Sequence, residues 1–469
     1  MSGGDSSTYL TVPFFAYIDL ILPVWPLWLI QEVAALYVLI FRERLDPRTL
    51  IFWIAVVTAL PFLGLLMYLA WGCTLFMRRD GSRKAESDAP VMAAEPDPVP
   101  EGDARLESVL RVAGADVYTE GNRADVVWNG MDALEGILRD LEGAEESVYI
   151  ETIELARNDI GDRMTQTLAA RASEGVDVRI LTSASGFGRT AGLDVMKKAG
   201  ARHATLHHRV HSVLSVSVKN RNLRNMIVID GRVAHIGVSS FVRVEGRGAA
   251  RAATRFLADW HHATGEDVEP PELPEPAEGG CGVQMVSSGP DSPTDPMLHG
   301  YSAMISEARD RLYITFPYLV PTDEVYNSIK QAVIAGTDVR ILIPAKCRHW
   351  YQPWNSLAAA NPLMQAGARV YFAPKSMAKS VVIADGRVCT VGSAVYTSRI
   401  WADYAENVVV YSEEAAGKAE EEFLRELEGA TECRPEEYEE RSFSDMIKIG
   451  IARLFMFLNR GPLFRGYLY

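Results

Sequence analysis

The sequence predicts an α/β protein made of two repeats that follow a membrane-spanning helical hairpin. Three observations support this fold class: two long apolar stretches near the N-terminus, an internal repeat in the rest of the chain, and apolar strands that alternate with helix-length segments. The apolar stretches cover residues 18–41 and 49–77. Each exceeds the roughly 20 residues that a helix needs to cross a bilayer. We therefore expect residues 1–77 to anchor the chain in a cell membrane as a multi-pass hairpin.

The charges around this segment leave its depth and orientation open. The first stretch contains Asp19, Gln31 and Glu32, which makes it the weaker span. Basic residues occur between the stretches and, in a larger cluster, after the second one: Arg42, Arg44, Arg48, Arg78, Arg79, Arg83 and Lys84. The larger cluster favours a cytoplasmic main body. A shallow hairpin that does not cross would satisfy both clusters.

The composition excludes some classes of function. The chain has 469 residues and a net charge of −14, which argues against a nucleic-acid-binding protein. Its five cysteines are scattered and form no CxxC pair, so we expect neither a disulfide framework nor a zinc site. No cofactor or metal ion is expected.

The repeat consists of four blocks that recur in the same order. Residues 146–155, 174–181, 198–202 and 227–237 correspond to 310–319, 335–342, 365–369 and 381–392. Four blocks in register indicate duplication. Each copy ends in two apolar runs around an Asp-Gly pair (Asp230-Gly231 and Asp385-Gly386), which predicts a tight β-hairpin. The predicted domains are an anchor (1–77), a flexible linker rich in Pro, Ala, Glu and Ser (78–104), two repeats (105–268 and 269–432) and an amphipathic C-terminal helix (433–469).

Several longer stretches resemble one known family. DPRTLIFWIAVVTALPFLGLLMYLAWG (46–72), FLADWHHATGE (256–266), VQMVSSGPD (283–291) and YITFPYLVP (313–321) are similar to segments of the bacterial cardiolipin synthases, in the phospholipase D superfamily. The resemblance implies two phospholipase-D-like repeats that form a pseudo-twofold pair. It also implies an enzyme that makes cardiolipin from phosphatidylglycerol through two copies of His-x-Lys-x4-Asp-x6-Gly-x2-Asn. One histidine attacks phosphorus, the other protonates the leaving oxygen, and lysine and asparagine neutralise the developing charge.

Both copies of this motif are degenerate here. In the first, Leu223 takes the histidine position, Asn225 the lysine position and Ser240 the asparagine position, while Asp230 remains. In the second, Met377 and Val395 replace histidine and asparagine, and Lys379 remains. With this alignment the aspartate falls on Ala384, or on Asp385 if the strand carries one extra residue; we prefer Asp385 with a β-bulge, because the following DGRVCTVG matches well. Losing a nucleophile costs on the order of 10⁶ in rate, so we expect no catalytic residue.

Candidate substrate-binding residues are those that survive around the motif: Lys379, Ser393, Asp230, Asp385 and Glu406. Lys379 could hold a lipid phosphate or pair with Asp230 or Glu406. Arg399 and Glu406 are expected to brace the wall of the site. Among the histidines, His207 and His211 have metal-binding spacing but are interpreted as part of a solvated loop, as are His261 and His262 at a helix end. His235 is expected to be packed within a strand.

The C-terminal residues 444–469 have apolar positions at helical spacing with interspersed Lys and Arg. An interfacial membrane helix and a helix packed on the second repeat or on a partner both fit this pattern. The leading hypothesis for function is a silent relative of cardiolipin synthase that binds phosphatidylglycerol or cardiolipin, an active synthase, or a second copy of itself. The alternatives are an active phosphatidyltransferase with unorthodox residues and a structural membrane protein.

Overall fold

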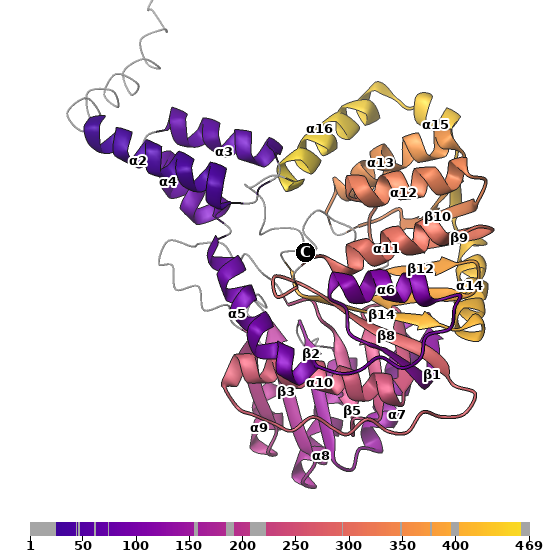
Figure 1. The fold of residues 1–469 in the computed structure, drawn as a ribbon. Coiled ribbons are helices and arrows are strands. Elements are labelled where there is room, and N and C mark those ends of the chain that lie inside the picture. Colours follow the sequence, from indigo (N-terminus) through magenta and orange to yellow (C-terminus); the bar gives the residue numbers. More distant parts are fainter. Residues whose placement is uncertain are drawn as a thin grey trace, which may run out of the picture. The chain divides into compact units, whose positions relative to one another are not determined.

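The computed structural model describes residues 25–460, except 44, 46, 61, 74, 154–157, 184–191, 207–221, 293, 348, 376–377 and 395–402 (Figure 1). The chain divides into two compact units. The first comprises residues 1–78, 210–218 and 458–468, and the second comprises 79–209 and 219–457.

The first unit contains short helices from the apolar N-terminal region. They are α2 (Trp25–Tyr37) with its π-helical continuation η2 (Val38–Arg42), α3 (Pro47–Ala59), α4 (Leu63–Met67) and η3 (Tyr68–Gly72). Trp53 and Tyr68 are buried between them, and the Tyr68 hydroxyl donates a hydrogen bond of 2.7 Å to Glu43. In the described ranges, no helix is both long enough and apolar enough to cross a membrane. The two expected spans are therefore not found there, because residues 49–77 are divided among shorter helices and residues 18–24 lie outside the described part.

The segment that was expected to be a flexible linker, 78–104, is ordered in the second unit. Helix α5 (Leu75–Met92) runs through its first half, and α6 (Ala104–Ala113) begins at its end. Between them, the Asp97 N–H donates to the Tyr118 carbonyl (3.1 Å). Arg251 donates to the Met92 carbonyl at 2.7 Å. The polar composition of this segment suggests a tether, but Lys84, Asp88 and Asp97 form ion pairs with residues far along the chain.

In the described part of the second unit, one mixed 15-stranded sheet runs through the fold. The strands of the first repeat are β1 (Tyr118–Val127), β2 (Ser147–Thr152), β3 (Asp177–Ser183), β4 (Arg202–Leu206), β5 (Met226–Ile229), β6 (Val233–Gly237) and β7 (Phe241–Glu245). Those of the second repeat are β8 (Cys281–Ser288), β9 (Arg311–Thr315), β10 (Asp338–Pro344), β11 (Arg369–Ala373), β12 (Val381–Ala384), β13 (Val388–Gly392), β14 (Ala405–Tyr411) and β15 (Thr431–Cys433).

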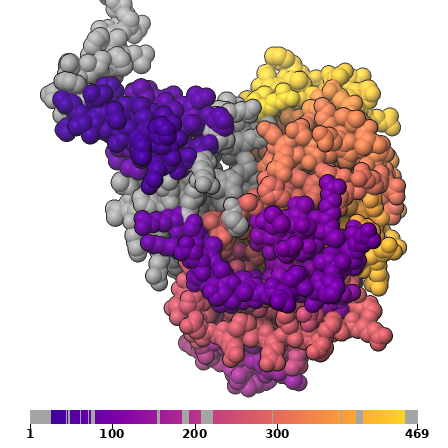
Figure 2. All heavy atoms as spheres, viewed as in Figure 1, coloured from indigo at the N-terminus to yellow at the C-terminus, as the bar shows by residue number. Residues whose placement is uncertain are grey.

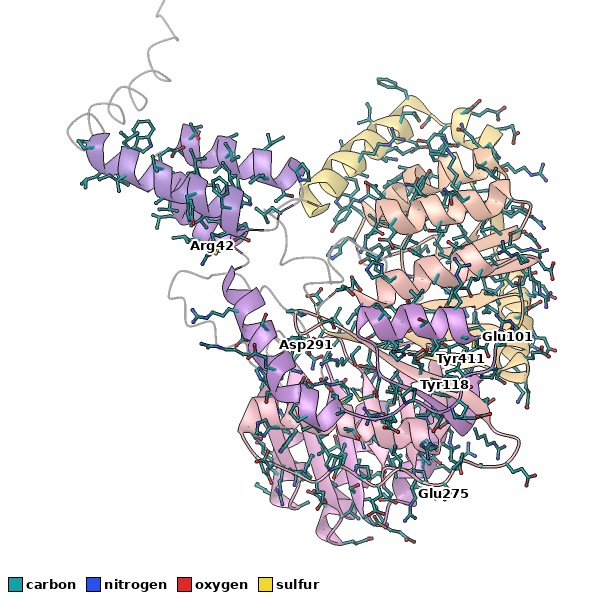
Figure 3. All side chains as sticks on the ribbon, in the orientation of Figure 1. Arg42, Glu101, Tyr118, Glu275, Asp291 and Tyr411 are labelled. Carbon is teal, nitrogen blue, oxygen red and sulfur yellow. The ribbon has the colours of Figure 1, made fainter. Side chains whose placement is uncertain are left out.

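The strand order confirms the duplication. It reads β15-β11-β10-β9-β12-β13-β14-β8-β1-β7-β6-β5-β2-β3-β4, so that, apart from β15, each half mirrors the other about the antiparallel β1–β8 pair. At this junction the rings of Tyr118 and Tyr411 meet edge to face with centroids 5.4 Å apart (Figure 3). The two repeats therefore form a pseudo-twofold pair within one continuous sheet.

Helices cover both faces of this sheet. In the first repeat they are α7 (Gly130–Glu142), α8 (Asp159–Ser173), α9 (Leu193–Lys198) and α10 (Arg247–Thr264). In the second they are α11 (Pro296–Glu307), α12 (Asp323–Ile334), α13 (Gln352–Ala366), α14 (Glu413–Leu427), α15 (Pro435–Glu439) and α16 (Phe443–Arg460). Helices α10 and α14 share one core, where Phe256 stacks on Tyr149 and Phe423 stacks on Tyr313, each at 5.0 Å. The same aromatic pair thus fixes the corresponding helix in each repeat.

Both Asp-Gly hairpins form as predicted. Asp230 and Gly231 have φ values of 51° and 63°, and Asp385 and Gly386 have 54° and 62°. A turn with positive φ at both central residues matches the twist of the strands that it joins. Aspartate is one of the few residues with a side chain that tolerates this region, and glycine tolerates it freely.

Candidate functional site

The sheet determines which residues occupy the motif positions in the second repeat. Strand β12 pairs with β9 and with β13 without any shift in register, so no extra residue is accommodated. The Gly392 N–H donates to the carbonyl of Ser380 (3.3 Å), just as the Gly237 N–H donates to that of Asn225 (3.1 Å). Ser380 is therefore the counterpart of Asn225, and Ala378 that of Leu223.

This register corrects the alignment made from sequence. The predicted bulge is absent, the lysine position holds Ser380 rather than Lys379, and the histidine position falls on Ala378 rather than Met377. Met377 itself lies outside the described residues. The error arose because Lys379 is one residue away from the motif's lysine position and on the opposite side of the strand. Its counterpart in the first repeat is Arg224.

The two motif aspartates fasten the hairpins to the sheet. The Asp230 carboxylate accepts hydrogen bonds of 2.8–3.0 Å from the backbone N–H groups of residues 145–147, where β2 begins. The Asp385 carboxylate accepts 2.9–3.2 Å bonds from those of residues 309–311, before and at the start of β9. Both carboxylates therefore have local structural partners, away from the other candidate residues.

Lys379 and Ser393 are also engaged with the protein itself. The Lys379 ammonium pairs with Glu426 of α14 at 2.8 Å and lies 4.7 Å from the ring centre of Trp128. Burial lowers the pKa of Lys379, and the hydrogen bond that its ammonium donates to Glu426 partly offsets this effect. Ser393 exchanges hydrogen bonds with the backbone of Glu406. The sequence predicted Asp230 or Glu406 as the partner of Lys379, whereas in the structure its partner is Glu426.

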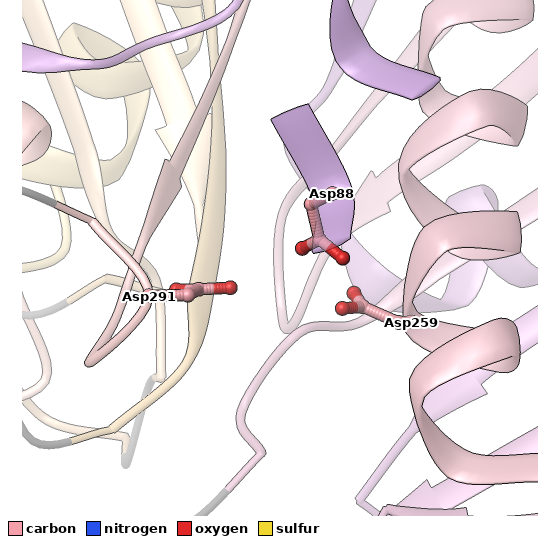
Figure 4. Close-up of side chains that lie close together, drawn as sticks. All are labelled: Asp88, Asp259 and Asp291. Carbon is pink, nitrogen blue, oxygen red and sulfur yellow. The ribbon is translucent and has the colours of Figure 1, made fainter. Parts of the chain in front are cut away.

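The centre of the second unit contains a buried network of charges that sequence reasoning did not identify. Lys84 lies among three aspartates: it contacts Asp88, and its ammonium is 2.6 Å from Asp259 and 2.9 Å from Asp291. Figure 4 shows these three carboxylates converging from α5, α10 and the segment after β8. Their oxygens lie within 4.8 Å of one another, close enough to hold a metal ion. The Lys84 ammonium, whose side chain is 0% exposed, supplies the positive charge there.

Two arginines complete the network. Arg224, between Leu223 and Asn225, donates to Asp259 at 2.7 Å and lies 3.4 Å from Glu406. Arg255 donates to Asp259 (2.8 Å) and to Asp88 (2.6 Å). Burial alone would raise the pKa of Asp259, but Arg224, Arg255 and Lys84 hold it well below its usual range. The three cations thus match the three aspartates in charge.

Glu151 and Glu406 border this network, and within the described residues they are carboxylates in excess of its three cations. Both are fully buried. Burial, reinforced by the nearby Asp259 charge, raises the pKa of Glu151 to about 8. Burial raises the pKa of Glu406 to about 7, although Arg224 and the Ser287 hydroxyl oppose this shift. Because the aspartates already balance the cations, ionising either glutamate adds an unmatched negative charge in a region of low dielectric.

The first repeat has no carboxylate at the position that corresponds to Glu406. Gly392 pairs with Asn407 across β13 and β14, whereas Gly237 pairs with Phe241 across β6 and β7. The residue that corresponds to Glu406 is therefore Ser240, which is buried. Only residues 238–240 connect the strands in the first repeat, against 393–404 in the second. The two halves of the site are thus unequal.

The remaining sequence predictions concern histidines and Arg399. His235 is packed as predicted, with its Nε2 atom 2.7 Å from Asp140. His261 lies near the end of α10 and its Nδ1 atom is 2.8 Å from the exposed Asp267. His207, His211 and Arg399 lie outside the described residues. Two signals could have revealed part of the network: the i,i+4 pairs Lys84–Asp88 and Arg255–Asp259.

Comparison with known proteins agrees with this architecture. Residues 301–427 match the family described as cardiolipin synthase, PLD-like domain. A cardiolipin synthase of Oceanobacillus iheyensis is 27% identical, with 91% of this chain and 96% of that protein covered. One of Geobacillus thermodenitrificans is also 27% identical, with 88% and 89% covered.

Among solved structures, the phosphatidylserine synthase of Haemophilus influenzae shares the fold with a TM-score of 0.57 at 10% identity. The match covers 76% of this chain and 97% of that one. The mirrored sheet, the paired hairpins and the similarity to these proteins all indicate the same duplicated α/β fold. The chain is similar to the bacterial cardiolipin synthases over most of its length, and it has an α/β fold in which residues 301–427 match their PLD-like domain.

Proposed function

We propose that this protein is a catalytically silent relative of the cardiolipin synthases that acts at the bacterial membrane by binding, either to phospholipid or to an active synthase. The observation that carries the proposal is the Lys84-centred network. The network fills the region beside the motif with paired charges. The histidine and lysine positions of the two motif copies are occupied by Leu223, Asn225, Ala378 and Ser380.

None of these four side chains can attack phosphorus as an imidazole does. Leucine and alanine carry no nucleophile or acid, and Asn225 and Ser380 hydrogen-bond to the carbonyls of Gly237 and Ala394. Transfer of a phosphatidyl group through a covalent intermediate needs both a nucleophile and an acid for the leaving oxygen. The motif positions of this chain supply neither.

The electrostatics also disfavour a phosphodiester at this place. A phosphate group is held where cations exceed anions, but Lys84, Arg224 and Arg255 are matched by Asp88, Asp259 and Asp291. A further anion would have to displace a carboxylate from a fully desolvated pair, at a cost of several kcal/mol. We therefore propose that phosphatidylglycerol or cardiolipin binds at the surface of the protein. Residues 1–77 are proposed to hold the chain at the membrane, with its second unit on the cytoplasmic side.

The competing proposal is an active phosphatidyltransferase that uses a buried carboxyl group as its acid. It is favoured by the raised pKa of Glu406, about 7, because a carboxyl that is half protonated near neutral pH can donate a proton. It leaves the nucleophile unassigned.

One assay separates the two. The full chain is expressed in a bacterial host that lacks cardiolipin synthases, and its membranes are supplied with phosphatidylglycerol. The silent proposal expects no cardiolipin and no free glycerol above a vector control, while the synthase of Oceanobacillus iheyensis produces both. Product that disappears in Glu406→Gln, but persists in the exposed control Glu421→Gln, contradicts the silent proposal and supports the active one.

A further inference from the structure

The C-terminal helix α16 (Phe443–Arg460) has one packed side and one open side. Ile449 packs in the core of the second repeat, Ala452 is buried, and Lys448 lies over Trp354 at 4.9 Å. The opposite side exposes Phe443 (82%), Met446 (42%), Ile447 (47%) and Ile451 (41%). These positions recur every three or four residues and form one apolar stripe. The C-terminal region, yellow in Figure 2, lies at the surface of this unit.

The charge of the helix indicates what covers this stripe. The acidic run in and just after α15 ends at Glu440, after which the net charge of the chain becomes positive. Helix α16 contains Lys448, Arg453 and Arg460 against one acid, Asp445, which gives a net charge of 3 − 1 = +2 in a chain of −14. Four charges in 18 residues prevent the helix from spanning a bilayer. An apolar face flanked by basic residues is typical of helices that lie in the headgroup region of anionic membranes.

We infer that α16 is an interfacial helix whose open side, Phe443, Met446, Ile447 and Ile451, inserts into an anionic phospholipid surface. Its packed side remains on the second repeat and carries the helix as part of that fold. This attachment would hold the unit that contains the motif positions against the lipid surface, in addition to any anchoring by residues 1–77. The inference concerns attachment, and it holds whether or not the site is silent.

The test uses the full chain, labelled with an environment-sensitive fluorophore through Ile447→Cys. A matched variant, Val112→Cys, places the same label on the exposed face of α6, where Val112 is 75% exposed. The unsubstituted chain, labelled in parallel, corrects for the native cysteines. Each protein is bound to vesicles of phosphatidylglycerol and phosphatidylcholine whose acyl chains carry bromine, and flotation confirms binding. Because bromine quenches only at short range, we expect severalfold stronger quenching at position 447 than at 112.

Two further measurements show whether anionic lipid or self-association of the protein covers the apolar stripe. Vesicles of phosphatidylcholine alone should reduce the quenching at position 447, because the basic residues then lose their anionic partner. Equal quenching at 447 and 112 would overturn the inference, and so would failure of the chain to float. A blue shift of the 447 label that occurs without vesicles and grows with protein concentration would also overturn it, because the stripe would then be a self-association surface. Formation of cardiolipin, which tests the silent proposal, does not affect any of these outcomes.

Discussion

Replacing Glu406 with glutamine should make the protein more stable at alkaline pH while leaving the acid side of the pH profile nearly unchanged. The substitution keeps the shape of the side chain and an oxygen that can accept from the Ser287 hydroxyl, which now lies 2.6 Å from Glu406. It removes only the ability to ionise. Glu406 is fully buried, so its charge is poorly solvated in the folded state.

The magnitude follows from the shift in pKa. Burial raises the pKa of Glu406 from 4.5 to about 7. The unfolded chain releases this proton at lower pH than the folded protein does, so the stability linked to Glu406 is fully present below pH 4.5 and is lost as pH rises toward 7. A difference of about 2.5 units corresponds to about 3 kcal/mol. The free energy of unfolding of Glu406→Gln, taken relative to the wild type, should therefore be about 3 kcal/mol higher above pH 8 than at pH 4.5.

Denaturant titrations of both proteins in detergent, from pH 4.5 to 8.5, measure this difference. Any constant cost of burying the new amide group cancels, since only the change with pH is compared. Glu421→Gln, exposed in the middle of α14, serves as the control and should follow the wild type at every pH. A difference between Glu406→Gln and the wild type that stays constant across this range would refute the reasoning, as would one that grows toward acid pH.

Three other changes test the structural assignments. Lys84→Met removes the ammonium from three buried carboxylates and should lower the free energy of unfolding by about 3–5 kcal/mol. The control Lys418→Met, at an exposed position, should lower it by under about 1 kcal/mol. A similarly small loss for Lys84→Met would contradict the network. Asp385→Ala leaves three backbone N–H groups without their acceptor, so hydrogen exchange should accelerate at residues 309–311 but not at 145–147, which Asp230 holds. Phe423→Leu removes the stack on Tyr313, so it should lower the free energy of unfolding by about 1 kcal/mol more than the lost apolar area accounts for. If the pseudo-twofold packing is correct, Phe256→Leu in the first repeat should lower it by a similar amount.

Local patterns in the chain were sufficient to predict the repeat and both hairpins. Four repeated blocks indicated the duplication, and the mirrored strand order confirms it. The Asp-Gly pairs predicted both hairpins, because few other residues tolerate two consecutive positive φ values. The flanking segments identified the family. These features could be predicted because each depends on residues that are neighbours along the chain.

Predictions that depended on distant residues fared differently. The polar composition of 78–104 indicated a linker, yet Lys84 pairs with Asp291, 207 positions further along the chain. No pattern within the segment records that partner. A local pattern also failed: the apolar stretch 49–77 predicted a single span, but the structure divides it among α3, α4, η3 and the start of α5.

The second motif separates what the sequence by itself determined from what only the tertiary structure decided. The sequence alone established that neither copy retains its histidine, because no histidine occurs near Leu223 or between Lys375 and Gly392. It could not decide whether Lys379 or Ser380 holds the lysine position, since one inserted residue would have made Lys379 fit. Hydrogen bonding of β12 to β9 and β13 decided in favour of Ser380, because a one-residue slip would turn every side chain of the strand to the other face of the sheet.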